Sequence, residues 1–456
     1  MTAMTIRART FIAAAGAEPV HDACIVVRDG RISAVGEWHD IDPDGELITV
    51  DGVLVPGFVD AHSHLRGLPL DAHGIRPRQF EAWICSLGAA TALDPQDEAL
   101  LATAELLETG VTAVQGFVDA SPQGSALAGA QGALAGVART GIRALIVLGF
   151  ADRALRRPEP PTGEWALVPP EEATLPTVRV RDVAAEWLDQ VTAPTIELGI
   201  GPIGAHWVTD ELLAAIAAAA GGSRVHTHLH ESRLHRRWVS GAASPLDRLD
   251  AAGLLDARLS GAHGVHLTPV ELARIARSGA ALVHCPLSND ALGVGTAEPG
   301  AWRAQAIPTA LGVDSQSPAA PDYFDVMRAA LHRSRATAHP LTAEDVFDMA
   351  TRGGARALGI ADGGRLAVGS PADVIMLDTA HATVDGIVET ATATAVREVW
   401  VAGHRVVTDG HSVTHARPAR DRLVTQLDAD RGARQRRAAA LAPTVDLVER
   451  LAGAMP

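Results

Sequence analysis

Residues 104–117, AELLETGVTAVQGF, join a helix-like stretch to a strand-like stretch through a single glycine, Gly110. Glycine after a helix readily adopts the left-handed cap conformation, and the apolar and β-branched residues that follow favour a strand. The same order returns at residues 136–148, GVARTGIRALIVL, and at residues 272–285, LARIARSGAALVHC. This repeated helix–glycine–strand order predicts an α/β fold with a parallel sheet.

Further strands and helices alternate along the middle of the chain. The expected strands cover residues 54–61, 112–117, 143–149, 196–201, 223–229, 260–265, 281–285 and 309–314. The expected helices cover residues 95–109, 125–140, 180–190, 209–220, 232–254 and 268–278. Strands that alternate with helices over about 300 residues predict a (β/α)8 TIM barrel. An open doubly wound sheet is the alternative, but no GxGxxG sequence follows the first strand.

Near its two ends the chain does not alternate helix and strand as in the middle but consists of short strand-like runs joined by turns. ACIVVRDGRISAVG (23–36) contains two strand-like runs joined by Asp29 and Gly30, a hairpin turn signal. GSPADVIMLD (369–378) and VREVWVAGHRVVTDG (396–410) are similar. We predict that both ends form one small composite β-sandwich domain. The expected division is 1–55 and 361–415 for the sandwich, 56–360 for the barrel and 416–456 for a C-terminal helical segment.

The composition excludes several classes of function. The net charge of −15 at pH 7 disfavours nucleic acid or an anionic membrane surface as a partner. All 39 basic residues are arginine, so a Schiff-base lysine, a Walker-type phosphate loop and a metal bridge of carboxylated lysine are excluded. The three cysteines form no CxxC pair, and no apolar run approaches the roughly 20 residues of a membrane span. We therefore expect a cytoplasmic protein.

Histidines and acidic residues gather at the C-terminal ends of the expected strands, where a barrel places its chemistry. The relevant segments are VDAHSH (59–64), HTHLHE (226–231), GAHGVH (261–266) and LGVD (311–314). Alternate residues of a strand share a face, so the three histidines of HTHLHE point the same way and either line a polar cavity or bind something. Neutral imidazoles with one carboxylate suit a catalytic metal site with a position left for water. The set predicts metal binding.

Several segments in this order resemble the amidohydrolase superfamily, specifically its mononuclear aminohydrolases, which include guanine, cytosine and S-adenosylhomocysteine deaminases and triazine hydrolases. They are GRISAVG (30–36), LVPGFVDAHSH (54–64), GVTAV (110–114), HTHLHES (226–232), AHGVHL (262–267), HCPLSN (284–289), LGVDS (311–315) and GSPADVIMLD (369–378). The resemblance extends over nearly the whole chain. It implies one divalent metal ion, with Zn²⁺ expected and Fe²⁺ or Mn²⁺ as alternatives, and a homodimer.

The resemblance also implies an activity and residue roles. The activity is hydrolytic deamination of an amino-substituted purine, pyrimidine, pterin or triazine-like ring, with ammonia released through a metal-bound hydroxide. Glu231 is the implied proton shuttle, His263 the contact to the polarised substrate atom, and Asp314 the proton acceptor. The implied metal ligands are His62, His64, His228 and Asp314.

Substrate-binding residues are expected mainly from the loops. Trp83 matches a family tryptophan that packs against the substrate base, although it can equally pack on its own loop. Two long segments, 65–92 and 150–178, are lid candidates. The further candidates for substrate binding are Arg76, His206, His263 and Ser315, and Arg153, Arg156 and Arg157 can pair with a carboxylate or carbonyl group.

The chain departs from the nucleoside deaminases of the family at the expected fourth strand. Ile203 follows Gly201 and Pro202 where those enzymes carry a histidine, and Gln115 replaces an acidic or asparagine-like residue. A free base, pterin or triazine is therefore expected rather than a nucleoside. The alternatives are hydrolysis of another C–N, C–Cl or cyclic amide bond, and a non-catalytic scaffold. Glu231 favours deamination, because an amine leaving group needs a proton.

Overall fold

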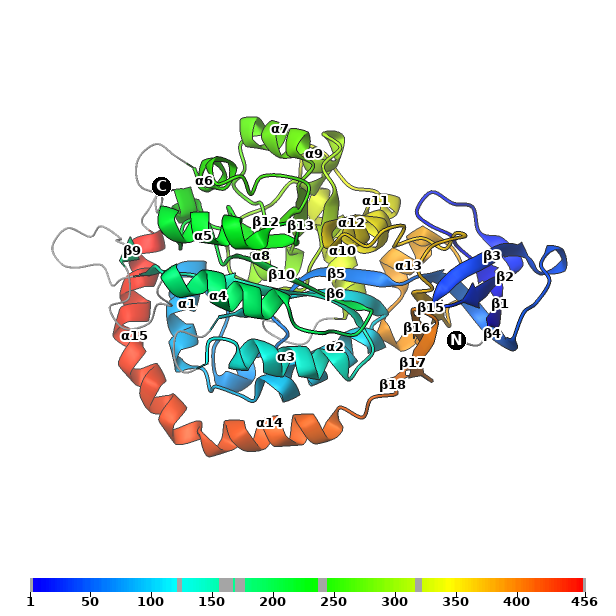
Figure 1. Ribbon diagram of the computed structural model, residues 1–456, viewed down its shortest axis with the longest axis horizontal. Helices are drawn as coiled ribbons and strands as arrows, with labels where there is room; N and C mark the ends of the chain where they lie inside the picture. Colours follow the sequence, from blue (N-terminus) through cyan, green and yellow to red (C-terminus); the bar gives the residue numbers. More distant parts are fainter. Residues whose placement is uncertain are drawn as a thin grey trace.

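The computed structural model describes residues 3–120, 125–155, 167–168, 177–236, 244–315 and 322–453. Figure 1 shows a strand barrel surrounded by helices and, at one end of the long axis, a separate sheet in which strands from residues 4–56 and 374–412 meet. The expected α/β fold with a TIM barrel and a composite β domain is confirmed.

The barrel is an eight-stranded sheet in the order β5-β6-β7-β10-β11-β12-β13-β14. Neighbouring strands pair in parallel. The strands are β5 (Phe58–Ser63), β6 (Val111–Asp119), β7 (Arg143–Phe150), β10 (Ile196–Pro202), β11 (Val225–Leu229), β12 (Leu259–His263), β13 (Ala281–His284) and β14 (Thr309–Leu311). A parallel bridge between Ser63 and Asp314 joins the last strand to the first. Closure of the barrel therefore brings the end of β5 next to Asp314, which follows β14.

The helices cover the outside of this barrel (Figure 1). They are α2 (Pro95–Glu108), α3 (Ala128–Ala138), α4 (Thr177–Leu188), α5 (Asp210–Ala220), α6 (Pro245–Ala251), α7 (Pro269–Ser278), α8 (Pro286–Ala291), α9 (Pro299–Ala304), α10 (Tyr323–Ser334), α11 (Ala343–Asp348) and α12 (Gly354–Leu358). The glycines that end the helix-like stretches, Gly110, Gly141 and Gly279, have φ of 86°, 75° and 77°. Their left-handed conformation is the one expected from the sequence.

Two expected elements are divided in the structure. The strand expected at 54–61 is two strands that meet at Gly57, where a Cβ atom would lie 2.0 Å from Thr112 Oγ1. The helix expected at 232–254 is wrong: a 3-10 turn covers Arg233–Arg236, and α6 begins only at Pro245. Ser244 and Asp247 form a capping box with Pro245 at the first turn, and this arrangement starts a new helix.

The second sheet contains eight strands in the order β18-β17-β16-β15-β4-β1-β2-β3. Its strands are β1 (Met4–Phe11), β2 (Val20–Arg28), β3 (Arg31–Glu37), β4 (Glu46–Pro56), β15 (Val374–Leu377), β16 (Val396–Val401), β17 (His404–Thr408) and β18 (His411–Ser412). The antiparallel pair β4–β15 joins the N-terminal half to the C-terminal half. The turn at Asp29 and Gly30 connects the antiparallel strands β2 and β3, as expected. A short helix, α13 (Val384–Thr390), precedes β16.

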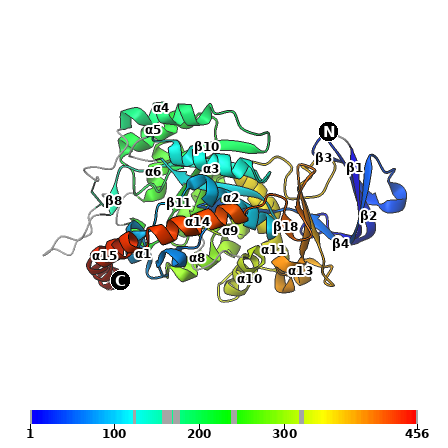
Figure 2. The same ribbon diagram turned by 90° about the horizontal axis from the view of Figure 1, so that it is seen from below.

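The C-terminal segment forms a helical arm that runs along the barrel (Figures 1 and 2). It consists of α14 (Arg417–Ala429) and α15 (Arg431–Gly453). Leu423 and Leu427 of α14 pack with Leu68, Leu93 and Leu101 of the barrel side. Val445 and Val448 of α15 pack against α1 (Phe80–Ser86), a helix in the long segment after β5. The arm therefore supports that segment from outside.

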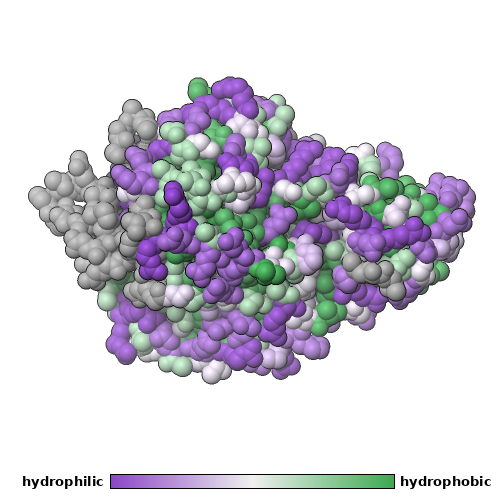
Figure 3. Space-filling view, viewed as in Figure 1, coloured by the Kyte–Doolittle hydropathy of each residue, from purple (hydrophilic) through white to green (hydrophobic). Residues whose placement is uncertain are grey.

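The surface seen in Figure 3 is largely hydrophilic, with apolar residues in scattered groups. The large hydrophobic side chains that are exposed lie far apart in the sequence, from Leu47 to Val424. None of the helices within the described ranges is long and apolar enough to cross a membrane.

Replacement of Phe58 by alanine is expected to lower the free energy of unfolding by about 3–5 kcal/mol. Phe58 is fully buried at the start of β5, and its ring packs against those of Tyr323, Phe324 and Phe347. The loss of the ring leaves a cavity that the surrounding barrel cannot fill. Denaturant unfolding checks this, with V424A as an exposed control expected to change stability by less than about 0.5 kcal/mol. Equal stability of the two variants would contradict the packing described.

Candidate active site

The closure of the barrel builds the centre of the candidate site. Asp314 N–H donates to His62 O at 2.8 Å, and His64 N–H donates to Asp314 O at 3.3 Å. Asp314 has φ of 63°, an unusual left-handed conformation for a residue with a side chain. This backbone geometry turns its carboxylate toward the histidines of β5. Strained backbone of this kind is concentrated at functional sites.

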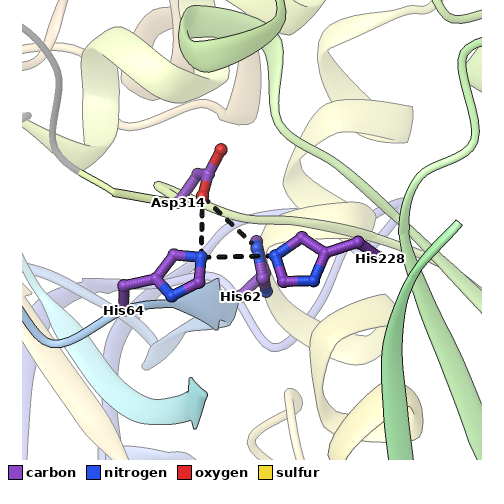
Figure 4. A group of neighbouring side chains, drawn as sticks. All are labelled: His62, His64, His228 and Asp314. Carbon is purple, nitrogen blue, oxygen red and sulfur yellow. Dashed lines mark hydrogen bonds and ion pairs between the residues drawn. The ribbon is translucent and has the colours of Figure 1, made fainter. Parts of the chain in front are cut away.

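The four expected metal ligands lie together at this point (Figure 4). His62, His64, His228 and Asp314 each offer one ligand atom, and these atoms all lie within 4.8 Å of one another. Asp314 Oδ1 is 3.4 Å from Nε2 of both His62 and His64. Nε2 of His228 is 3.2 Å from Nε2 of His64. In Figure 4 the four side chains converge from β5, from β11 and from the end of the last barrel strand.

The protonation of this group fits a divalent cation. Burial lowers the pKa of His62 to about 4 and holds the pKa of His228 well below its usual range, so both imidazoles are neutral. Burial alone would raise the pKa of Asp314, but the adjacent imidazoles of His62 and His64 outweigh it and hold that pKa well below its usual range. Nε2 of His62 is buried without a hydrogen-bond partner among the described residues. Three imidazoles and one carboxylate with free lone pairs match a catalytic metal site.

The other two histidines of HTHLHE face elsewhere. His226 lies deeper in the barrel, with Nε2 2.9 Å from Nδ1 of His62. His230 has φ of 47° and turns its Nε2 toward Glu271, 3.2 Å away. Of the three, only His228 belongs to the four-residue group.

Glu231 and His263 lie next to this group. One ligand-type atom from each of Glu231, His263 and Asp314 falls within 4.8 Å of the others. Glu231 Oε1 is 3.7 Å from His263 Nε2, and Nδ1 of His263 is 3.0 Å from Asn289 Oδ1. Burial raises the pKa of Glu231 well above its usual range, and the like charges of Asp314 and Glu81 add to this. This shift favours the protonated form of Glu231, which can act as an acid.

A cavity of about 300 Å³ opens beside these residues. It is lined by the side chains of His64, Arg66, Phe80, Trp83, Ile84, Leu87, Asp119, Ala151, Arg153, Ile203, Trp207, His228, Glu231, Asp314 and Ser315. Of the expected substrate-binding residues, Trp83, Arg153 and Ser315 are in its wall. His263 is fully buried behind it.

Two other expected substrate-binding residues are also absent from the wall of this cavity. Arg76 lies at a different cavity, between the segment after β5 and helix α15. His206 is fully buried, and its ring stacks on that of His235 with centroids 3.8 Å apart. The neighbouring Trp207 reaches the cavity in its place. Arg156, Arg157 and most of the lid candidate 150–178 lie outside the described residues.

Several residues of the site were not identified from the sequence. Asp119 ends strand β6 and lines the cavity, so the rule that polar residues at strand ends carry function could have found it. Ser288 donates a hydrogen bond to Asp314, and its neighbour Asn289 contacts His263. Both belong to the segment HCPLSN.

Comparison with known proteins identifies relatives over most of the chain. A 5-methylthioadenosine/S-adenosylhomocysteine deaminase of Teredinibacter turnerae is 31% identical over 384 residues, which cover 79% of this chain and 81% of that protein. An 8-oxoguanine deaminase of Pseudomonas aeruginosa is 29% identical over 368 residues, 77% of this chain and 81% of that protein.

A solved structure extends this likeness to the fold. The adenosine deaminase of Xanthomonas campestris with bound zinc has a TM-score of 0.77 and 26% identity, and the match covers 92% of this chain and 98% of that one. Residues 53–406 match the amidohydrolase family, and this range includes the whole barrel with all four clustered side chains. The chain is a member of the amidohydrolase family.

Proposed function

We propose that this enzyme catalyses the metal-dependent hydrolytic deamination of an amino-substituted nitrogen heterocycle and releases ammonia. The observation that carries the proposal is the buried carboxyl of Glu231, which lies beside the three imidazoles and the carboxylate of the four-residue group. An acid at this place can protonate a ring nitrogen, and the aspartate beside it can pass the water proton to the leaving amine, which deamination requires. The deaminase names of the relatives point the same way.

His62, His64, His228 and Asp314 would hold the metal ion, for which we propose Zn²⁺. Nitrogen-rich ligand sets suit zinc, although iron or manganese can bind the same ligands. When bound, such an ion lowers the pKa of a coordinated water to about 7 and so supplies the nucleophile at neutral pH.

The side chains of this chain perform the remaining steps. Asp314 accepts the proton of the attacking water through its carboxylate. Glu231 donates its proton to the ring nitrogen next to the carbon under attack, which makes that carbon a better electrophile. The ring of His263, whose Nε2 lies 3.7 Å from Glu231 Oε1, would contact the oxygen added to that carbon. Asp314 then delivers the proton taken from water to the exocyclic nitrogen, and ammonia leaves. The proton that remains on the added oxygen returns to Glu231, so the ring keeps a carbonyl oxygen and the acid is restored.

The cavity supports a flat ring with polar substituents as the substrate. Trp83 and Trp207 offer aromatic faces, while Arg66, Arg153 and Asp119 offer charged groups that can bind ring substituents. Ile203 is in the wall of the cavity. It follows Gly201 and Pro202, the position at which the nucleoside deaminases of the family carry a histidine. Gln115 is fully buried and donates to Ala61 O, so it is not available to a sugar. We therefore favour a free base, pterin or triazine-like ring.

Replacement of Trp83 by alanine is expected to raise KM by about tenfold, because stacking on an aromatic ring contributes about 0.5–1.5 kcal/mol. W83F keeps an aromatic face and is expected to raise KM less than about threefold. Steady-state kinetics checks both variants, and thermal unfolding controls for lost packing with Phe80. An unchanged KM in W83A would mean that the indole packs only on its own loop.

A panel assay tests the proposed reaction. Zinc-loaded protein is incubated with guanine, cytosine, isocytosine, adenine, pterin, amino-triazines and S-adenosylhomocysteine, and ammonia is measured. Rapid ammonia release from one free ring supports the proposal. Chloride release from a chlorotriazine, or opening of a cyclic amide without ammonia, would instead favour the alternative hydrolase.

We further propose a homodimer in the cytoplasm. Cys24, Cys85 and Cys285 are all free thiols, and Cys24 and Cys285 are buried, which suits a reducing compartment. The homodimer follows from the family resemblance, and sedimentation of the purified protein measures it directly.

A further inference from the structure

A line of buried hydrogen bonds leads away from the proposed metal site on the far side of His62. Gln115 Nε2 is 2.9 Å from Ala61 O, and Ser260 Oγ is 3.3 Å from Gln115 Oε1. His226 Nδ1 is 2.8 Å from Ser260 Oγ, and His226 Nε2 is 2.9 Å from His62 Nδ1. Gln115, Ser260 and His226 are at most 1% exposed. Solvent therefore does not supply alternative partners.

The direction of every hydrogen bond in this line follows from its first member. Ala61 O is a backbone carbonyl and can only accept, so the amide NH₂ of Gln115 faces it and Oε1 faces Ser260. Oε1 can only accept, so the Ser260 hydroxyl donates to it. The Ser260 oxygen then accepts from His226, which places the His226 proton on Nδ1 and its lone pair on Nε2.

The last hydrogen bond, between His226 Nε2 and His62 Nδ1, determines the tautomer of the proposed metal ligand His62. Because Nε2 of His226 accepts, Nδ1 of His62 must carry the proton and donate. The lone pair of His62 then lies on Nε2, the atom that faces Asp314 and His64 in the four-residue group. We propose that Gln115, Ser260 and His226 are positioning residues that hold His62 in the tautomer able to bind the metal. This inference rests on the proposed function of the site as a metal centre.

His228 shows why His62 needs such a line. Nδ1 of His228 is 2.7 Å from the backbone carbonyl of Ile203, and one carbonyl is enough to hold its proton on Nδ1. His62 lies at the centre of the barrel, where His226 and not a carbonyl faces its Nδ1. A neutral imidazole can donate or accept at either nitrogen, so His226 alone would leave the direction open. Ser260 and Gln115 remove this ambiguity, because the carbonyl of Ala61, the residue before His62, fixes the orientation of the Gln115 amide and so the direction of every later hydrogen bond.

The test compares Ser260→Ala with Ser260→Thr in the full-length protein. In S260A the Nδ1–H of His226 loses the hydroxyl acceptor at 2.8 Å, and its proton can move to Nε2. His62 must then accept at Nδ1 and carry its proton on Nε2, which blocks the metal. Loss of such outer partners lowers metal affinity by about 10–100-fold. S260T keeps the hydroxyl and is expected to remain within about threefold of wild type.

Zinc affinity is measured by competition with a chromophoric chelator, and the thermal stability of each metal-free variant is measured beside it. A merely structural role predicts a lower melting temperature with unchanged zinc affinity, and that result would overturn the inference. If S260A does not fold, Gln115→Met serves instead, because it removes the acceptor of the Ser260 hydroxyl. It too is expected to weaken zinc binding by about tenfold or more.

A spectroscopic readout addresses the tautomer itself. In Co²⁺-loaded protein the N–H protons of ligating imidazoles give strongly shifted NMR signals, and that of His62 should exchange slowly with D₂O in wild type and S260T. Faster exchange in S260A supports the proposal, and identical exchange in all three proteins contradicts it. These readouts need no substrate. If the protein binds zinc as described but deaminates nothing, the proposed reaction fails and this inference stands; if wild type and H62A bind zinc equally weakly, the metal centre itself is refuted.

Discussion

The E231Q variant is expected to turn over its substrate at least about 10²-fold more slowly than wild type while retaining its metal. Glutamine has nearly the same shape as the protonated glutamic acid, but its amide cannot act as an acid. Burial and the nearby carboxylates raise the pKa of Glu231 well above its usual range, which favours the protonated form that can donate to the substrate. The kcat for ammonia release and the metal content of the purified variant are the two measurements.

Glu105→Gln is a matched control for this experiment. It makes the same chemical change on α2, whose residues do not line the cavity. We expect its kcat to equal that of wild type. Full activity in E231Q would refute the role of Glu231 as the acid, and loss of the metal in E231Q would show that the residue supports the centre instead.

The D314N variant is expected to lose at least about 10³-fold in activity and to bind the metal more weakly. Asp314 supplies the one carboxylate of the four-residue group and is also the proposed acceptor of the water proton. The amide keeps the size of the side chain but loses its charge and its capacity as a base. Ammonia release and metal content after dialysis against a weak chelator measure the two effects separately.

Asp378→Asn, an exposed position after β15, is the control for D314N and should behave as wild type. A D314N protein that retains both metal and turnover would contradict the proposed centre. Retained metal with lost turnover would show that Asp314 acts chiefly as the base.

Most of the barrel could be predicted from the sequence because its signals are local. The glycines at 110, 141 and 279 mark helix ends by their own conformational freedom, whatever surrounds them. The helix expected at 232–254 failed although the signal that divides it is also local. Gly241 disfavours a continuous helix, and Ser244, Pro245 and Asp247 mark the start of a separate one.

The proposed metal ligands could also be anticipated, because a parallel barrel brings all its strand ends to one rim. His62, His64, His228 and Asp314 need only their positions at strand ends to meet. The cavity wall depends instead on how loops pack. Arg76 is in the segment after β5 like Trp83, but it faces the cavity beside α15, and no local pattern distinguishes the two.

The measurement that tests the account most directly is a metal titration of the ammonia-release rate. Metal-free protein receives increasing Zn²⁺, and the rate is followed with the ring amine that reacts fastest. We predict no activity without metal and a linear rise that saturates at one zinc ion per chain, with no such rise in D314N. Ammonia release from the metal-free protein, or the same rise in D314N, would contradict a metal-dependent deaminase built on His62, His64, His228 and Asp314.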